Sequence, residues 1–205
     1  MEDAHPELVH VASTPSTQDL ARDLPVGAIV LADHQSHGRG RMGRRWEASP
    51  GSALLASFVL TPGPVLSLAA GVAAAEACGA DVRLKWPNDL LLGDRKVGGI
   101  LVEVSGGKAV CGIGINLTSA PPGAAALGRP RDEIFSSLRE RLRHWTSRPA
   151  DEVLERWREL SATLGRRVRI DQGGQTREGI AEDLGPHGEL VVDGAMFSSG
   201  SVTHL

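Results

Sequence analysis

Short apolar stretches separated by polar turns predict a mixture of strands and helices over residues 1–164. Apolar, partly β-branched runs indicate strands at residues 28–32, 53–60, 82–86, 97–104 and 109–115. Apolar residues at helical spacing predict a helix that begins near Ser16 and further helices at 65–78, 131–146 and 151–164. This order of elements predicts an α+β fold in which helices pack against a mixed β-sheet.

From Arg166 onward the pattern changes to short strands and tight turns. Strands are expected at residues 167–170, 179–183, 190–192 and 201–205. Roughly forty residues are too few for a large core, so we expect a small SH3-like β-barrel. The predicted domains are therefore a main domain over residues 1–164 and a small β-barrel domain over residues 165–205.

One loop concentrates positive charge and glycine between two predicted strands. Residues 38–46 read Gly-Arg-Gly-Arg-Met-Gly-Arg-Arg-Trp, with four arginines and three glycines. Glycines let backbone N–H groups turn toward a ligand, and guanidinium groups suit phosphate or carboxylate. The loop is therefore predicted to bind an anion.

The spacing Gly38-x-Gly40-x-x-Gly43 also matches the dinucleotide-binding fingerprint, but its context does not. That motif opens a long helix and is followed about twenty residues later by an acid. Pro50 and Gly51 prevent such a helix, and residues 60–64 contain no acid. The sequence also lacks a phosphate-binding P-loop.

Composition excludes several other classes of protein. The 205 residues include 22 Lys and Arg against 25 Asp and Glu, so the global charge does not predict nucleic-acid or anionic-membrane binding. Cys78 and Cys111 lie too far apart for a disulfide framework or a zinc motif. Residues 1–14 have no apolar signal segment, and the stretch at 69–77 is short and contains Glu76. A cytoplasmic protein is expected.

A second group of candidate functional residues lies at residues 85–100. Lys85-Trp86-Pro87-Asn88-Asp89 ends a predicted strand with a proline turn, and Lys96 precedes the pair Gly98-Gly99. Paired glycines weaken a strand, so they indicate a ligand close to the backbone.

Taken in order, these motifs resemble those of the biotin protein ligases, in the short form without an N-terminal DNA-binding domain. The matching segments are Ser16-Thr17, Gly38-Arg39-Gly40-Arg41 with Gly43-Arg44 and Trp46, Lys85 to Asp89, Arg95-Lys96 with Gly99-Ile100-Leu101, and Gly114-Ile115-Asn116-Leu117. The resemblance implies that residues 1–164 form a catalytic domain that binds biotin and ATP. It further implies formation of biotinyl-5′-AMP and transfer of biotin to a lysine of a biotin carboxyl carrier protein domain, such as that of acetyl-CoA carboxylase.

The resemblance also implies roles for individual residues. The catalytic residues would be Lys96, Arg41 and Asp89. Biotin would contact Ser16, Thr17, Gln18, Gln35, Gly38, Arg39, Gly40, Arg41, Lys96, Gly98 and Gly99. ATP would contact Arg44, Trp46, Asn88 and Asn116, and Mg²⁺ would be held mainly by the ATP phosphates, without protein ligands.

Some features leave alternatives open. Asp89 either takes a proton from the acceptor lysine or only caps the turn at Pro87. Gln18 replaces the family's usual Asn, which puts its role in doubt. Only fifteen residues precede Ser16, so no specific DNA binding is expected.

Two other functions remain as alternatives. One is a lipoate or octanoate ligase or transferase of the same superfamily, and the other is a non-catalytic biotin- or RNA-binding module. The absence of Tyr, with three Phe and four Trp, disfavours base-stacking RNA recognition. The sequence leaves open whether the protein is a monomer or a homodimer, which acceptor it modifies, and whether the loop is ordered without ligand.

Overall fold

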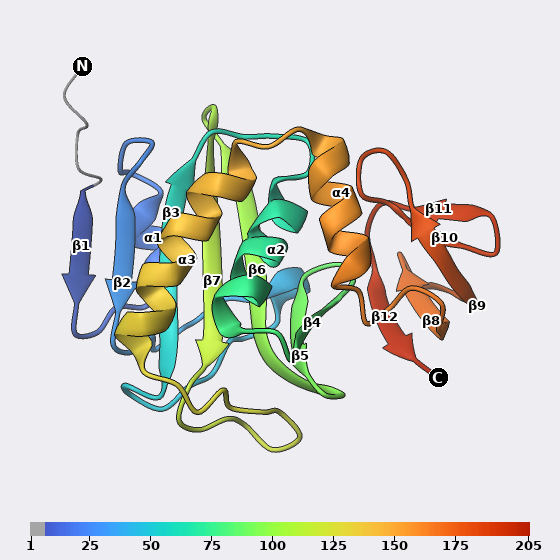
Figure 1. The fold of residues 1–205 in the computed structure, drawn as a ribbon. Helices are drawn as coiled ribbons and strands as arrows, with labels where there is room; N and C mark the ends of the chain where they lie inside the picture. Colours follow the sequence, from blue (N-terminus) through green and yellow to red (C-terminus); the bar gives the residue numbers. More distant parts are fainter. Residues whose placement is uncertain (1–6) are drawn as a thin grey trace. The chain divides into compact units, whose positions relative to one another are not determined.

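The computed structural model describes residues 7–205 (Figure 1). The contacts within the chain divide it into two compact units. The first unit combines the chain up to Gly63 with Arg95–Ser136. The second combines Pro64–Asp94 with Ser137–Leu205. The domain boundary expected between residues 164 and 165 stays a prediction.

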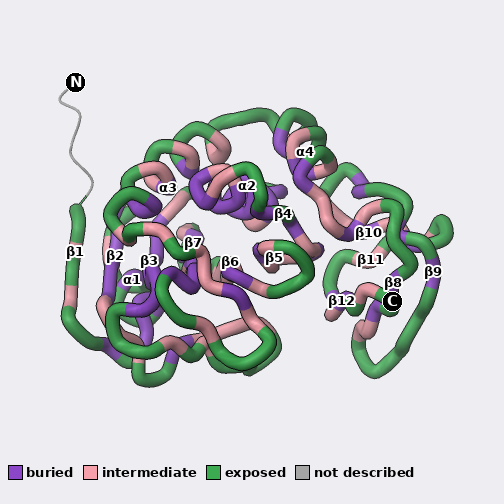
Figure 2. Tube along the Cα trace, turned by 60° about the horizontal axis from the view of Figure 1, so that its bottom comes forward, coloured by how far each residue is buried: buried purple, intermediate pink, exposed green. Residues whose placement is uncertain are grey.

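The first unit contains five adjacent strands of a mixed sheet. Their order is β1(Leu8–Val11), β2(Ile29–Ala32), β3(Ala53–Leu60), β7(Lys108–Asn116) and β6(Arg95–Ser105). β1 pairs parallel to β2, and the other pairings are antiparallel. Helix α1(Thr17–Ala21) packs against β2, β3 and β7. The central strands are buried along almost their whole length (Figure 2).

In the second unit, helix α2(Leu66–Cys78) packs against two short strands and a second helix. The strands β4(Val82–Lys85) and β5(Asp89–Leu92) pair antiparallel, and α4(Ala150–Glu159) lies against α2. α2 is apolar on all sides and almost wholly buried, as expected for a helix enclosed by other elements. No helix within residues 7–205 has the length and apolar character needed to cross a membrane.

The C-terminal part forms a second, antiparallel sheet. Its order is β11(Ala195–Phe197), β10(Leu190–Val192), β9(Gln175–Leu184), β8(Arg167–Gln172) and β12(Ser201–His204). The α+β class and a small C-terminal β-structure are thus confirmed. β11 and β12 are the edges of this sheet, and no pairing described for residues 7–205 closes it into a barrel.

The sequence pattern did not predict three short strands, and it predicted one helix to be longer than it is. β1, β5 and β11 have only three or four residues each, which gives little periodicity to detect. The helix predicted to end at residue 164 ends at Glu159. The next residues instead run beside β4, where the Ala162 N–H donates to the Leu84 carbonyl at 2.7 Å.

Glu76 joins α2 to both neighbouring helices of the second unit. Its carboxylate accepts hydrogen bonds from Arg141 (2.6 Å) and Trp145 (3.0 Å) of α3(Arg131–Thr146), and from Arg156 of α4 (2.8 Å). Burial opposes ionisation, but the hydrogen bonds from Trp145 and Arg156 hold the pKa of Glu76 below its usual value. The charged carboxylate is therefore part of the helix packing.

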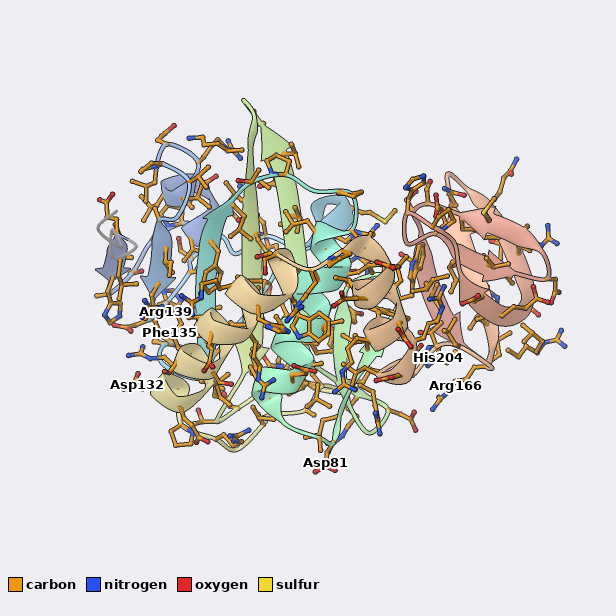
Figure 3. The ribbon with its side chains drawn as sticks, turned by 45° about the horizontal axis from the view of Figure 1, so that its top comes forward. Asp81, Asp132, Phe135, Arg139, Arg166 and His204 are labelled. Atoms are coloured by element: carbon orange, nitrogen blue, oxygen red, sulfur yellow. The ribbon has the colours of Figure 1, made fainter. Side chains whose placement is uncertain are left out.

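Trp86 is fixed by two hydrogen bonds within the second unit. Its indole N–H donates to the Gly188 carbonyl at 3.0 Å, and its backbone N–H donates to Thr163 Oγ1 at 3.0 Å. The same Thr163 oxygen lies 3.1 Å from His204 Nε2. The Lys85–Asp89 turn is thus connected to the C-terminal sheet through Trp86, and His204 lies beside Arg166 (Figure 3).

Replacing Glu76 with Gln should destabilise the protein by about 2–3 kcal/mol, because two arginines and an indole N–H lose a charged acceptor. Urea unfolding measures this. The matched control is Glu159→Gln, which breaks an exposed pair with the same Arg156 and should cost less than about 0.5 kcal/mol. Equal effects of the two substitutions would contradict the assignment.

His204 should make stability depend on pH. Burial, together with the positive charges of Lys85 and Arg166, lowers the pKa of His204 from 6.5 to about 4, against an opposing effect of Asp94. Because the unfolded chain takes up this proton first, stability should fall as pH decreases from 6.5 toward 4. Urea unfolding at about pH 7 and about pH 5 should show a smaller loss for His204→Gln than for wild type. An equal loss in both proteins would refute the effect.

Candidate active site

A network of polar side chains joins the start of α1 to β3 and to Gln35, which lies in the loop after β2. The Thr17 backbone N–H and hydroxyl donate to Gln35 Oε1 at 2.7 and 3.0 Å. Thr17 Oγ1 also lies 2.8 Å from Ser57 Oγ, which donates to Gln18 Oε1 at 3.1 Å. Ser16 is buried, and its hydroxyl oxygen has no hydrogen-bond partner among residues 7–205. The network therefore fixes Thr17 and Gln35 and leaves Ser16 available to a ligand.

The arginine-glycine loop connects β2 to β3, as predicted, and folds into a small hairpin. Arg39 and Arg45 face each other in an antiparallel bridge, Gly40 N–H donates to the Arg44 carbonyl at 2.7 Å, and Trp46 N–H donates to the Gly38 carbonyl at 3.0 Å. Its tip is a 3-10 turn, η1(Arg41–Gly43), in which Met42 and Gly43 have positive φ values of 56° and 72°. The exposed tip consequently presents the arginine side chains around a tight backbone turn.

Side chains from other segments lie directly against the backbone of two glycines of β7. A Cβ on Gly114 would lie 2.6 Å from Trp46 Cε2, and a Cβ on Gly112 would lie 3.1 Å from Gln18 Cδ. Gly99 of β6 pairs with Gly114, and Lys96 Nζ lies 5.8 Å from the centre of the Trp46 ring. We call Gly99, Gly112 and Gly114 the glycine floor.

Asn116 lies at the end of β7 and is linked to Lys96 through one residue of the next loop. Its Nδ2 donates to the Ala125 carbonyl at 3.1 Å, and Ala125 N–H donates to the Lys96 carbonyl at 2.8 Å. In the part of the chain described, Asn116 Oδ1 and Trp46 Nε1 are both buried and lack a partner. Asn116 Oδ1 is a hydrogen-bond acceptor and the Trp46 indole N–H is a donor, and both lie in the first unit. Such a pair is suited to the polar edge of a heterocycle.

The structure brings most of the predicted site residues into the first unit. There the contacts above connect Thr17, Gln18, Gln35, Gly38, Trp46, Lys96 and Gly99, and the same unit holds Ser16, Arg39, Gly40, Arg41, Arg44, Gly98 and Asn116. Asn88 and Asp89 belong to the second unit, where Asp89 pairs with Lys85 across β4 and β5.

Sequence reasoning missed three contributors to this arrangement. The repeat Gly-Ile-Gly-Ile of β7 could have revealed Gly112, because glycines two apart on a strand indicate close approach on one face. The third contributor besides Ser57 is Glu103, which accepts hydrogen bonds from Gln18 and Arg39. Neither Ser57 nor Glu103 gave a signal, since single polar residues in a strand are common. Their partners become visible only when α1 is packed on the sheet.

Neither thiol is suited to act as a nucleophile, and no metal site is formed by protein groups in the described part of the chain. Cys78 and Cys111 are both buried, and burial raises the pKa of Cys111 to about 12. Within residues 7–205, no group of three or more His, Cys, Asp or Glu side chains is placed to hold a metal ion.

Comparisons with known proteins agree with this geometry. The model of the Biotin/lipoate A/B protein ligase family matches residues 10–118. A relative from Mycobacterium tuberculosis, named biotin–(acetyl-CoA-carboxylase) ligase, is 34% identical over 87% of this chain and 79% of its own length. A relative of the same name from Paracoccus denitrificans is 34% identical over 90% of this chain and 93% of its own length.

Solved structures extend the similarity to nearly the whole chain. The biotin protein ligase of Aquifex aeolicus, in complex with biotin and ATP, has a TM-score of 0.82 at 26% identity and covers 97% of this chain and 98% of its own. The biotin acetyl coenzyme A carboxylase synthetase of Helicobacter pylori, with bound biotinylated ATP, has a TM-score of 0.76 at 28% identity and covers 94% and 99%. The chain therefore belongs to the Biotin/lipoate A/B protein ligase family.

Proposed function

We propose that this protein is a biotin protein ligase. It uses ATP to form biotinyl-5′-AMP and then passes the biotinyl group to a lysine of a biotin carboxyl carrier domain. The observation that carries the proposal is the set of buried polar atoms without a partner within residues 7–205, on Ser16, Arg39, Trp46 and Asn116, in the unit that also holds Lys96 and the arginine-glycine loop. The relatives named as biotin–(acetyl-CoA-carboxylase) ligases support the choice of biotin and of this acceptor class.

The biotin end of the site is assigned to α1. The ureido group of biotin offers two N–H donors and a carbonyl acceptor, and the Ser16 hydroxyl can either donate or accept. Because Gln35 Oε1 already accepts twice from Thr17, these two residues chiefly hold one another in place. The hydroxyl and amide groups gathered at the start of α1 favour a compact polar head over the long aliphatic chain of octanoate.

The first chemical step brings the biotin carboxylate to the α-phosphate of ATP, and two anions repel one another. Fixed cations lower this barrier, and Lys96, Arg41 and Arg44 of the first unit are the residues assigned to it. Mg²⁺ would be held by the triphosphate oxygens, where it neutralises the leaving pyrophosphate. Asn116 and Trp46 are assigned to the adenine, and Asn88 to ATP.

In the second step the acceptor lysine amine attacks the biotinyl carbonyl, an amide bond forms, and the bond to the phosphate breaks so that AMP leaves. This step needs an amine that has lost its proton. Asp89 remains the candidate for accepting this proton, and the hydrogen bonds that fix Trp86 restrict the turn on which Asp89 lies. The loop hairpin would exclude water from the mixed anhydride while it awaits the amine.

The remaining assignments complete the proposal. We assign the catalytic domain to residues 1–164 and the small β-domain to residues 165–205. The protein is cytoplasmic, binds neither membranes nor a specific DNA sequence, and its state as a monomer or homodimer is left to measurement. The alternative, a lipoate or octanoate ligase of the same family, would use the same adenylation logic; a cysteine-dependent octanoyl transfer is disfavoured because the Cys111 thiol stays protonated.

Exchange of labelled pyrophosphate into ATP tests the substrate directly. With Mg²⁺, we expect exchange with biotin and none above background with lipoate or octanoate. Exchange that depends on lipoate or octanoate instead would move the protein to the alternative function. Absence of exchange with every acid would leave only a binding role.

Replacing Lys96 with Ala should lower the rate of biotin-dependent exchange by at least about 100-fold, because a fixed cation at the developing charge is lost. The matched control is Lys108→Ala, since Lys108 donates to the carbonyls of Arg22 and Leu24 in the same unit. The control should keep wild-type exchange within about twofold. An active Lys96→Ala protein would remove that residue from the mechanism.

A further inference from the structure

Glu103 lies on β6 and connects two parts of the site that are far apart in the sequence. One of its oxygens, Oε2, lies 3.2 Å from Gln18 Nε2 on α1 and 3.0 Å from an Arg39 terminal nitrogen on the loop. Arg22 lies at 3.7 Å from the same oxygen. A single carboxylate therefore receives hydrogen bonds from both the helix and the hairpin.

The length of the Gln18 side chain makes this contact possible. Gln18 is 4% exposed, lies on the glycine floor at Gly112, and points its amide nitrogen toward Glu103 and the Leu101 and Val110 carbonyls. An asparagine at this position would place its amide about 1.5 Å nearer the backbone, one carbon–carbon bond short. The glutamine that departs from the family pattern is thus the residue that reaches Glu103.

Arg39 has a different environment from that expected of a phosphate ligand. The same terminal nitrogen lies 3.0 Å from Asp19 and 3.0 Å from Glu103, and Arg22 lies 3.9 and 3.7 Å from the same two carboxylates, so two carboxylates balance two guanidinium charges. An arginine balanced in this way contributes little positive potential to a bound anion. Its geometry is suited to holding the hairpin against α1 and β6.

We propose that Glu103 is a positioning residue that fastens the arginine-glycine loop to α1 through Arg39 and Gln18. We call these three residues the Glu103 tether. The biotin role of the loop and helix rests on the proposed function, but the tether itself is a property of the protein without ligand. It acts on binding, because it holds the loop in its hairpin before biotin arrives and so reduces the ordering cost of binding. It leaves the chemical step to Lys96 and Arg41.

An isolated exposed ion pair would contribute little, and Glu103 is partly exposed. The tether differs because a buried amide shares the carboxylate oxygen, so loss of Glu103 removes an acceptor from Gln18 as well as from Arg39. Replacing Glu103, or shortening Gln18 so that its amide no longer reaches Glu103, should therefore have the same consequence.

Trypsin reports on the hairpin without any ligand, because the loop contains Arg39, Arg41, Arg44 and Arg45. In the absence of biotin and ATP, Glu103→Ala and Gln18→Asn should each speed cleavage at these arginines by about fivefold or more, as identified by fragment masses. The matched control is Glu133→Ala, which removes an exposed pair with Arg129 in the same unit and should leave the rate unchanged. Cleavage of both tether variants at the wild-type rate would overturn the tether.

Exchange kinetics test its effect on binding. Both variants should raise KM for biotin by about tenfold with kcat within about twofold of wild type, whereas a folding defect would lower kcat instead. The double variant should be no worse than the worse single variant, because both substitutions break one connection. Gln18→Asn installs the residue usual in the family, so a lower KM for that variant would show direct biotin binding and overturn the proposal. If wild type fails to exchange with biotin, the proposed function falls and the protease result alone decides the tether.

Discussion

The glycine floor of β6 and β7 is the constraint on which the rest of the site depends. A sheet of ordinary residues projects side chains from its face, and these would keep a helix or loop several ångströms away. Because Gly112 and Gly114 have none, the Gln18 side chain and the Trp46 ring lie directly on the strand backbone. This close approach brings α1, the loop and Lys96 to one face of the sheet, and it explains why glycine occurs twice in a central strand of the sheet.

The distribution of charge follows from this packing. The chain is acidic overall, with 25 acids against 22 bases, yet its loop carries four arginines. The carboxylates of Asp19 and Glu103 pair with both Arg39 and Arg22, and the proposed tether uses Arg39 to hold the loop. In the proposed function, Lys96, Arg41 and Arg44 meet the anionic ligand. The like charges would in this way be divided between holding the loop and meeting the substrate.

The sequence predicted the elements that depend on local pattern and could not predict those that depend on packing. The strands at residues 28–32 and 53–60 and the loop between them are confirmed, because their apolar runs and glycines are local signals. The end of α4 was placed too late, because the pairing of Ala162 with Leu84 is a long-range contact. The partners of Gln18 could not be anticipated either, since Leu101, Glu103 and Val110 are more than eighty residues away. Roles assigned by motif to Asp89 and the arginines stay predictions.

The most direct test of this account is calorimetric titration of biotin into Gly114→Ala, with Gly63→Ala as the control. A Cβ at Gly114 would lie 2.6 Å from the Trp46 ring, whereas a Cβ at Gly63 would meet nothing within 4 Å. We predict that Gly114→Ala weakens biotin binding by at least about tenfold and remains folded, because displacing Trp46, whose backbone N–H donates to the Gly38 carbonyl, moves the loop segment assigned to biotin, while the control binds as wild type does. Wild-type affinity in Gly114→Ala would show that biotin does not depend on the glycine floor, and the account of the site would be wrong.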